Sequence, residues 1–270
     1  MSERVGGDLV AVESLTPAGA DAHDMELSPA AVADLGEADV VVYLSGFQPA
    51  VDDAVATTAP EHVLDAAGPA ELMAAPDHDH AHEDHDHEGH DHGHEGHDHG
   101  GVDPHFWLDP VRLGAVAQEL AREFGAADPG NADSYESNAA ELARQLDELD
   151  DRFREGLASC EQRTLVAGHE AYGYLAEKYG LEQAGVAGLD PEAEPSPARL
   201  AEVGEIIEEQ GVTTVFTESR LNPKVARTLA EDHGIDSAVL DPVESQVDGT
   251  RDYQQVMRAN LEALRAGLGC

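Results

Sequence analysis

The second half of the chain alternates between strand-like and helix-like segments, and this pattern constrains the fold most. Short apolar runs at Thr164–Ala167, Val212–Thr217 and Ser237–Leu240 alternate with longer segments, one of which begins at the capping pair Ser196-Pro197. Strands joined by helices pair in parallel and need helices on both faces of their sheet. We therefore expect an α/β unit with a parallel sheet flanked by helices.

The first half shows the same alternation and ends in a long helix. Ser28-Pro29 and Asp109-Pro110 each mark a helix start, the alternating segment Asp8–Ser14 predicts a short strand, and Val40–Tyr43 is typical of a buried strand. From Asp128-Pro129, apolar residues fall three or four positions apart over about six turns of helix. They are Tyr135, Ala139, Leu142, Leu146, Leu149, Phe153 and Leu157.

This pattern predicts a three-part domain organisation. We expect an N-terminal αβ lobe over residues 1–128, a linking helix over residues 129–158 and a C-terminal αβ lobe over residues 159–270. A histidine-rich segment at residues 77–100 interrupts the first lobe. It has no hydrophobic periodicity and is predicted to be a disordered surface loop.

That segment is also a candidate metal-binding element. It holds ten of the chain's fifteen histidines, interleaved with acidic residues and with no Lys or Arg. Imidazole is the commonest metal-binding side chain, so we interpret these histidines as accessory metal ligands. They are His78, His80, His82, His85, His87, His90, His92, His94, His97 and His99.

Three other histidines lie at the boundaries of predicted elements. These are His23, His105 and His169. In open α/β sheets, ligands bind beyond the carboxyl ends of the strands, where such histidines could converge. Tetrahedral zinc needs a fourth ligand, and both Glu218 and Asp241 follow predicted strands, so the pattern leaves that choice open.

Charge and cysteine content narrow the functional classes. The net charge of −41 argues against nucleic acid as a partner, because the phosphate backbone would repel the chain. The sequence contains no run of eighteen apolar residues, so no membrane span is predicted. No export signal is visible after Met1. The two cysteines, Cys160 and Cys270, would form one disulfide if the protein is exported.

Several motifs together resemble a known family. GADAHDMELSP, VDPHFWLDP and AGHEAYGYLAEKYGL, in that order, are similar to the cluster A-I (cluster 9) solute-binding proteins of zinc and manganese ABC importers, and most similar to the ZnuA-type zinc-binding proteins. The resemblance implies two αβ lobes joined by a long rigid helix, with one metal in the cleft between them. It assigns the ligand roles to His23, His105, His169 and Asp241.

The resemblance also implies a function. We expect an extracytoplasmic protein, periplasmic or anchored at the cell surface, that is monomeric, captures Zn²⁺ and delivers it to the permease of an ABC importer. Mn²⁺ fits less well, since manganese-type relatives carry Glu where this chain has His169. Relative to the family, the chain starts inside the first helix, and Ala22 precedes His23 where Pro or an acid is usual.

Two alternatives stay open at this level. The chain could be a zinc buffer in which the histidine-rich segment is the functional element. It could also be a zinc enzyme with three histidines and an activated water. The sequence disfavours an enzyme, because His169-Glu170 is followed by Gly173 in place of the second histidine of an HExxH motif.

Overall fold

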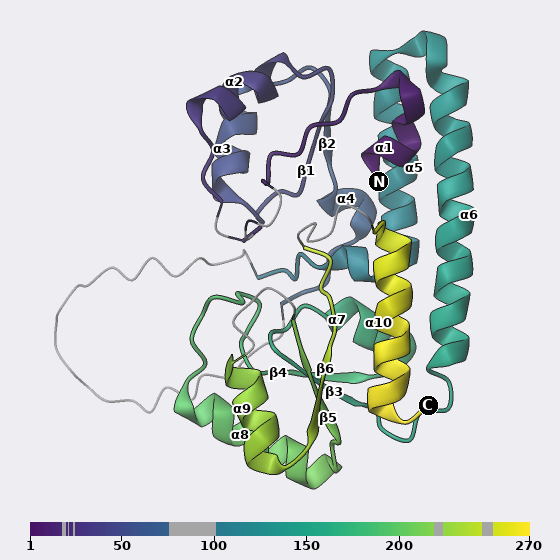
Figure 1. Cartoon of the computed structure of the whole chain (residues 1–270). Helices are drawn as coiled ribbons and strands as arrows, with labels where there is room; N and C mark the ends of the chain where they lie inside the picture. The colour runs from purple at the N-terminus through teal and green to yellow at the C-terminus, as the bar shows by residue number, and fades with distance from the viewer. Residues whose placement is uncertain (18–19, 21, 24, 76–100, 219–223, 245–250) are drawn as a thin grey trace, which may run out of the picture.

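A computed structural model gives the fold of the chain (Figure 1). The residues that it describes are 1–17, 20, 22–23, 25–75, 101–218, 224–244 and 251–270.

The C-terminal half forms a four-stranded parallel sheet. Its strands are β3 (Thr164–Ala167), β4 (Glu182–Gly185), β5 (Thr214–Thr217) and β6 (Asp236–Val239), in the order β4-β3-β5-β6. The chain first moves outward from β3 to β4 and then returns to place β5 on the other side of β3. The order of the strands therefore reverses between β3 and β5, and the carboxyl ends of these two strands flank a topological switch point.

Helices cover both faces of this sheet (Figure 1). On one face, α7 (Gly173–Tyr179) and α10 (Tyr253–Leu268) pack on Leu165 and Phe216. On the other, α8 (Pro197–Gln210) and α9 (Lys224–His233) pack on Val166 and Val215. Neighbouring residues of each strand thus point to opposite faces, and both faces are buried, as the apolar runs predict.

The N-terminal half holds a smaller sheet. Strands β1 (Val41–Tyr43) and β2 (Val63–Asp65) pair in parallel. The strand expected over Asp8–Ser14 is not formed: a short 3₁₀ turn occupies its first residues, and Leu9 and Val12 are exposed. The remaining elements of this half are α1 (Ser2–Gly6), η1 (Gly7–Leu9), α2 (Pro29–Glu37), α3 (Pro49–Thr58), α4 (Ala67–Ala70), η2 (Phe106–Leu108) and α5 (Pro110–Ala127).

A long helix contributes to the cores of both halves. After η3 (Pro129–Asn131), α6 (Ala132–Gly156) packs along α5, and Figure 1 shows it running along both halves of the structure, with α5 and α10 between it and the sheets. Leu146 is part of the N-terminal core, whereas Phe153, two turns later, is part of the C-terminal core. The predicted α/β class, with parallel sheets flanked by helices, is confirmed, and the exact lobe boundaries remain a prediction.

A disulfide joins Cys160, just after α6, to Cys270 at the end of the chain, which confirms the expected pairing. Over the described ranges, no helix combines the length and the hydropathy needed to cross a bilayer.

Candidate metal centre

Three histidines from distant parts of the chain converge in the interior. His23 precedes α2, His105 immediately precedes η2, and His169 follows β3. Their ring centroids lie 5.4 to 6.2 Å apart, and all three side chains are almost completely buried. The structure thus brings together the three histidines that the sequence singles out.

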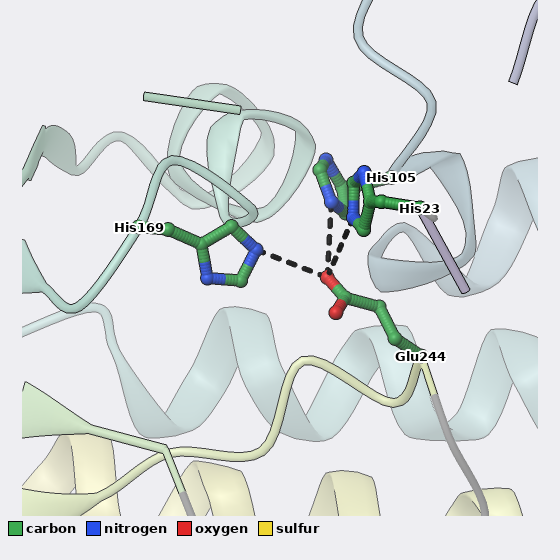
Figure 2. Close-up of side chains that lie close together, drawn as sticks. All are labelled: His23, His105, His169 and Glu244. Atoms are coloured by element: carbon green, nitrogen blue, oxygen red, sulfur yellow. Dashed lines mark hydrogen bonds and ion pairs between the residues drawn. The ribbon is translucent and has the colours of Figure 1, made fainter. Parts of the chain in front are cut away.

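The fourth member of the group is Glu244, a few residues beyond the end of β6. Figure 2 shows its carboxylate pointing at the three imidazole rings. Glu244 Oε1 lies 3.0 Å from His105 Nε2, 3.0 Å from His169 Nε2 and 3.7 Å from His23 Nε2. One ligand atom from each of the four residues lies within 4.8 Å of the other three.

These distances suit a tetrahedral metal ion. Ligand bonds of about 2.0–2.1 Å, as for zinc with nitrogen and oxygen, place neighbouring ligand atoms of a tetrahedron about 3.3 Å apart. The three separations from Glu244 Oε1 bracket that value. Three imidazole nitrogens and one carboxylate oxygen therefore fit a four-coordinate ion without a large rearrangement of the protein.

Two further carboxylates orient the imidazoles from behind. Asp103 Oδ1 lies 2.7 Å from His105 Nδ1, and Glu218 Oε1 lies 2.5 Å from His169 Nδ1. A carboxylate that accepts the Nδ1 proton leaves Nε2 as the metal-binding atom and makes it more basic. Both Nε2 atoms are the ones that face Glu244.

The cluster shifts the pKa values of its members in opposite directions. Burial lowers the pKa of His169, but hydrogen bonds to Glu218 and Glu244 outweigh burial and raise it to about 10. The pKa of His105 is raised in the same way against burial, by Asp103 and Glu244. Burial raises the pKa of Glu244, yet hydrogen bonds from the three histidines hold it well below its usual range. The raised pKa values of His105 and His169 favour their protonated forms beside the Glu244 carboxylate.

The two carboxylates considered as fourth ligand lie elsewhere. Glu218 follows β5 and hydrogen-bonds to the far side of His169. Asp241 is outside the four-residue group, and its Oδ1 accepts a hydrogen bond from the Val243 backbone N–H. Sequence reasoning missed Glu244, although the same DPVES segment contains it, three residues after Asp241.

The histidines of the predicted loop, residues 77–100, lie outside the described residues. All four residues of the centre belong to the part of the chain that the structure describes.

Comparison with known proteins decides the family. The family model described as "ZnuA: Zinc-uptake complex component A periplasmic" matches residues 1–267. The chain belongs to the ZnuA family. The resemblance seen in the sequence motifs is thereby confirmed, and the family is one of transport components and not of enzymes.

Relatives of this ZnuA-family chain include two named zinc proteins. The zinc-binding lipoprotein AdcA of Streptococcus pneumoniae R6 is 34% identical over 276 residues, which cover 98% of this chain and 52% of AdcA. The high-affinity zinc uptake system protein ZnuA of Bacillus subtilis is 33% identical over 95% of this chain and 80% of that protein. The chain thus spans about half the length of AdcA.

A solved structure supports the same assignment for the fold. The Zn(II)-bound ZnuA-like domain of S. pneumoniae AdcA superposes with a TM-score of 0.79 and 31% identity, covering 100% of this chain and 94% of that domain. The whole of this chain therefore superposes on most of the ZnuA-like domain of its longer relative.

Proposed function

We propose that this chain binds Zn²⁺ through His23, His105, His169 and Glu244 and delivers it to the permease of an ABC importer. The observation that carries the proposal is the four-residue centre, whose donor atoms lie within 4.8 Å of one another and whose carboxylate oxygen lies 3.0–3.7 Å from the three nitrogens. The naming of AdcA and ZnuA as zinc-binding and zinc uptake proteins supports the same metal. Glu244 takes the carboxylate role in place of Asp241.

The donor set supports zinc over manganese. Imidazole suits Zn²⁺, whereas Mn²⁺ prefers sites rich in carboxylate and carbonyl oxygen. Three of the four donors here are imidazole nitrogens. We therefore expect Zn²⁺ to bind more tightly than Mn²⁺ at this centre.

Four protein ligands also favour capture over catalysis. Catalytic zinc sites keep one position open for water, whereas closed sites use four protein ligands. If Glu244 completes the tetrahedron, no position remains for an activated water. A carrier needs this closed arrangement, because the ion must be sequestered from solvent until release.

The cellular role follows by analogy with the relatives. The family is described as periplasmic, and the S. pneumoniae relative as a lipoprotein. We propose an extracytoplasmic location, a monomeric state and the importer permease as the partner that receives the ion. The strongly negative chain, with a net charge of −41, would also raise the local concentration of cations.

Zinc titration of three proteins tests this proposal. We would compare the intact chain, a deletion of residues 77–100 and His169→Ala by calorimetry, with a competing chelator for the tight site. One tight site that survives the deletion and collapses in His169→Ala is expected. If tight binding is lost in the deletion of residues 77–100 but is unchanged in His169→Ala, the protein is a histidine-rich zinc buffer instead.

A further inference from the structure

The turn that carries Glu244 has an unfavourable backbone conformation. Val243 has a φ of 59°. Left-handed backbone is disfavoured for L-residues and is a marked outlier for a β-branched side chain. The other described non-glycine residues with positive φ, Ala59 and Glu71, terminate helices, where this conformation is common. Val243 terminates no helix, and it directly precedes Glu244, the carboxylate of the four-residue group found among the described residues.

Hydrogen bonds hold this turn from α10. Asn260, buried on α10, accepts from the Asp241 backbone N–H at 2.9 Å and donates its Nδ2 to the Asp241 carbonyl at 2.7 Å. Asp241 Oδ1 in turn accepts from the Val243 N–H at 2.9 Å. A strained backbone persists only where the surroundings over-determine it, and these contacts supply that constraint.

A fourth hydrogen bond holds the same turn from the side of the histidines. Trp107, two residues after His105, donates its Nε1–H to the Pro242 carbonyl at 2.8 Å. Asp241, Pro242 and Val243 are therefore each fixed by a hydrogen bond, and Glu244 follows directly. The carboxylate reaches the three imidazoles from a preformed turn and not from a free loop end.

From these contacts we infer that Asp241 is a positioning residue, which together with Asn260 holds Val243 in the left-handed conformation and so presets Glu244 for the metal. The inference rests on the proposed function, because it assigns Asp241 a role in that same site. Asp241 acts on the backbone that precedes the fourth ligand, whereas Asp103 and Glu218 hydrogen-bond directly to the imidazoles of two ligands.

A double-mutant cycle tests the inference. The variants are Asp241→Ala, Glu244→Gln and the double variant, with zinc affinity measured by chelator competition. Loss of a residue that orients a metal ligand typically weakens binding by about 10–100-fold. We expect Asp241→Ala to weaken zinc binding in this range, and to have little further effect once Glu244 is replaced, because coupled residues are non-additive.

Conservative and rescue variants separate positioning from general stability. Asp241→Asn keeps the acceptor Oδ1 and should retain most of the affinity. Adding Val243→Gly to Asp241→Ala should restore part of it, since glycine adopts positive φ without strain. Asp232→Ala, at an exposed position on α9, is the matched control and should bind zinc as the wild type does. The absorption spectrum of bound Co²⁺ should change in Asp241→Ala and recover in Asp241→Asn.

Distinct outcomes overturn the two levels of the argument. If Glu244→Gln binds zinc as tightly as the wild type, the proposed ligand set is wrong, and the positioning role of Asp241 is overturned as well. If Glu244→Gln weakens binding but Asp241→Ala does not, or does so additively, only the positioning role is overturned. Should Asp241→Ala fail to fold, Asn260→Asp keeps the acceptor for the Asp241 N–H but removes the donor to the Asp241 carbonyl, and additivity with Glu244→Gln then overturns the inference.

Discussion

His169 and Glu218 follow the neighbouring strands β3 and β5 and are joined by a hydrogen bond from Nδ1 to Oε1 of 2.5 Å. The bond lies at the topological switch point of the sheet, where α/β proteins bind their ligands. One strand end thus supplies a metal-facing imidazole, and the next strand end supplies the carboxylate that orients it. Both side chains are almost fully buried, so water does not compete for this hydrogen bond.

The first prediction concerns this pair. Glu218→Gln removes the negative charge behind His169 while keeping the size of the side chain. Zinc affinity should fall by about 10–100-fold, as expected for the partner of a metal-binding histidine. Chelator competition measures it, with Glu182→Gln on β4, which is exposed, as the control. An unchanged affinity in Glu218→Gln would show that His169 needs no carboxylate to bind the ion.

The second prediction is a pH dependence of zinc binding. The pKa of His169 is raised to about 10, and that of His105 is also raised, so the metal-free site holds protons at neutral pH. Zinc requires the unprotonated imidazole and must displace them. The apparent zinc affinity should therefore increase as the pH rises from 6 to 9. For each proton that zinc displaces, the increase should be about tenfold per pH unit. Calorimetry in buffers of different ionisation enthalpy counts these protons, and a pH-independent affinity would contradict the account.

A third prediction concerns the stability of the metal-free protein. The pKa of His169 is raised above its unfolded value of about 6.5. Its stabilising contribution is thus complete below about pH 6.5 and is lost as the pH rises toward 10. The pKa of Glu244 is lowered below 4.5, so its contribution is complete above that pH and is lost as the pH falls. Urea unfolding of the chelator-treated protein should show a decline in stability from pH 6.5 to 10.

His169→Ala is the control for that decline. Without the imidazole, the part of the pH dependence due to this cluster should disappear, and the slope between pH 6.5 and 10 should be shallower than in the wild type. Parallel slopes in the two proteins would show that other groups cause the decline.

The fourth prediction concerns the disulfide. Cys160 and Cys270 are 110 residues apart in sequence, and their bond joins the chain after α6 to the end of α10. Closing a loop of that length stabilises a protein by about 4–5 kcal/mol in the chain-entropy model. A Cys160→Ser, Cys270→Ser double variant should have a free energy of unfolding, measured by urea denaturation, that is lower by about this amount. Its zinc affinity should match that of the wild type, because neither cysteine is among the four residues of the metal centre.

Much of the fold could be predicted because local chemistry specifies it. Ser28, Asp109 and Ser196 precede proline, and in each case the side chain caps the helix that follows. Strand β4 escaped prediction, because its residues Glu182–Gly185 are polar or small and lack the pattern of a buried strand. Helix α7 begins at Gly173, and the four residues before it form the turn that carries the imidazole of His169.

The metal centre was only partly predictable for a related reason. The three histidines stand at ends of elements, which is a signal that sequence periodicity can reveal. The position of Glu244 depends on the left-handed conformation of Val243 and on Asn260, far along the chain. A β-branched residue gives no sequence signal for such a turn, so the segment DPVES could not show which of its carboxylates faces the histidines.

The most direct test of the central claim is a crystal structure of the zinc-loaded protein with anomalous data collected at the zinc edge. The account predicts one strong peak about 2.0–2.2 Å from Nε2 of His23, His105 and His169 and from a carboxylate oxygen of Glu244. Asp241 should lie outside this coordination sphere, with its hydrogen bond to the Val243 N–H intact. A peak coordinated by Asp241, or one with Glu244 turned away from the histidines, would contradict it.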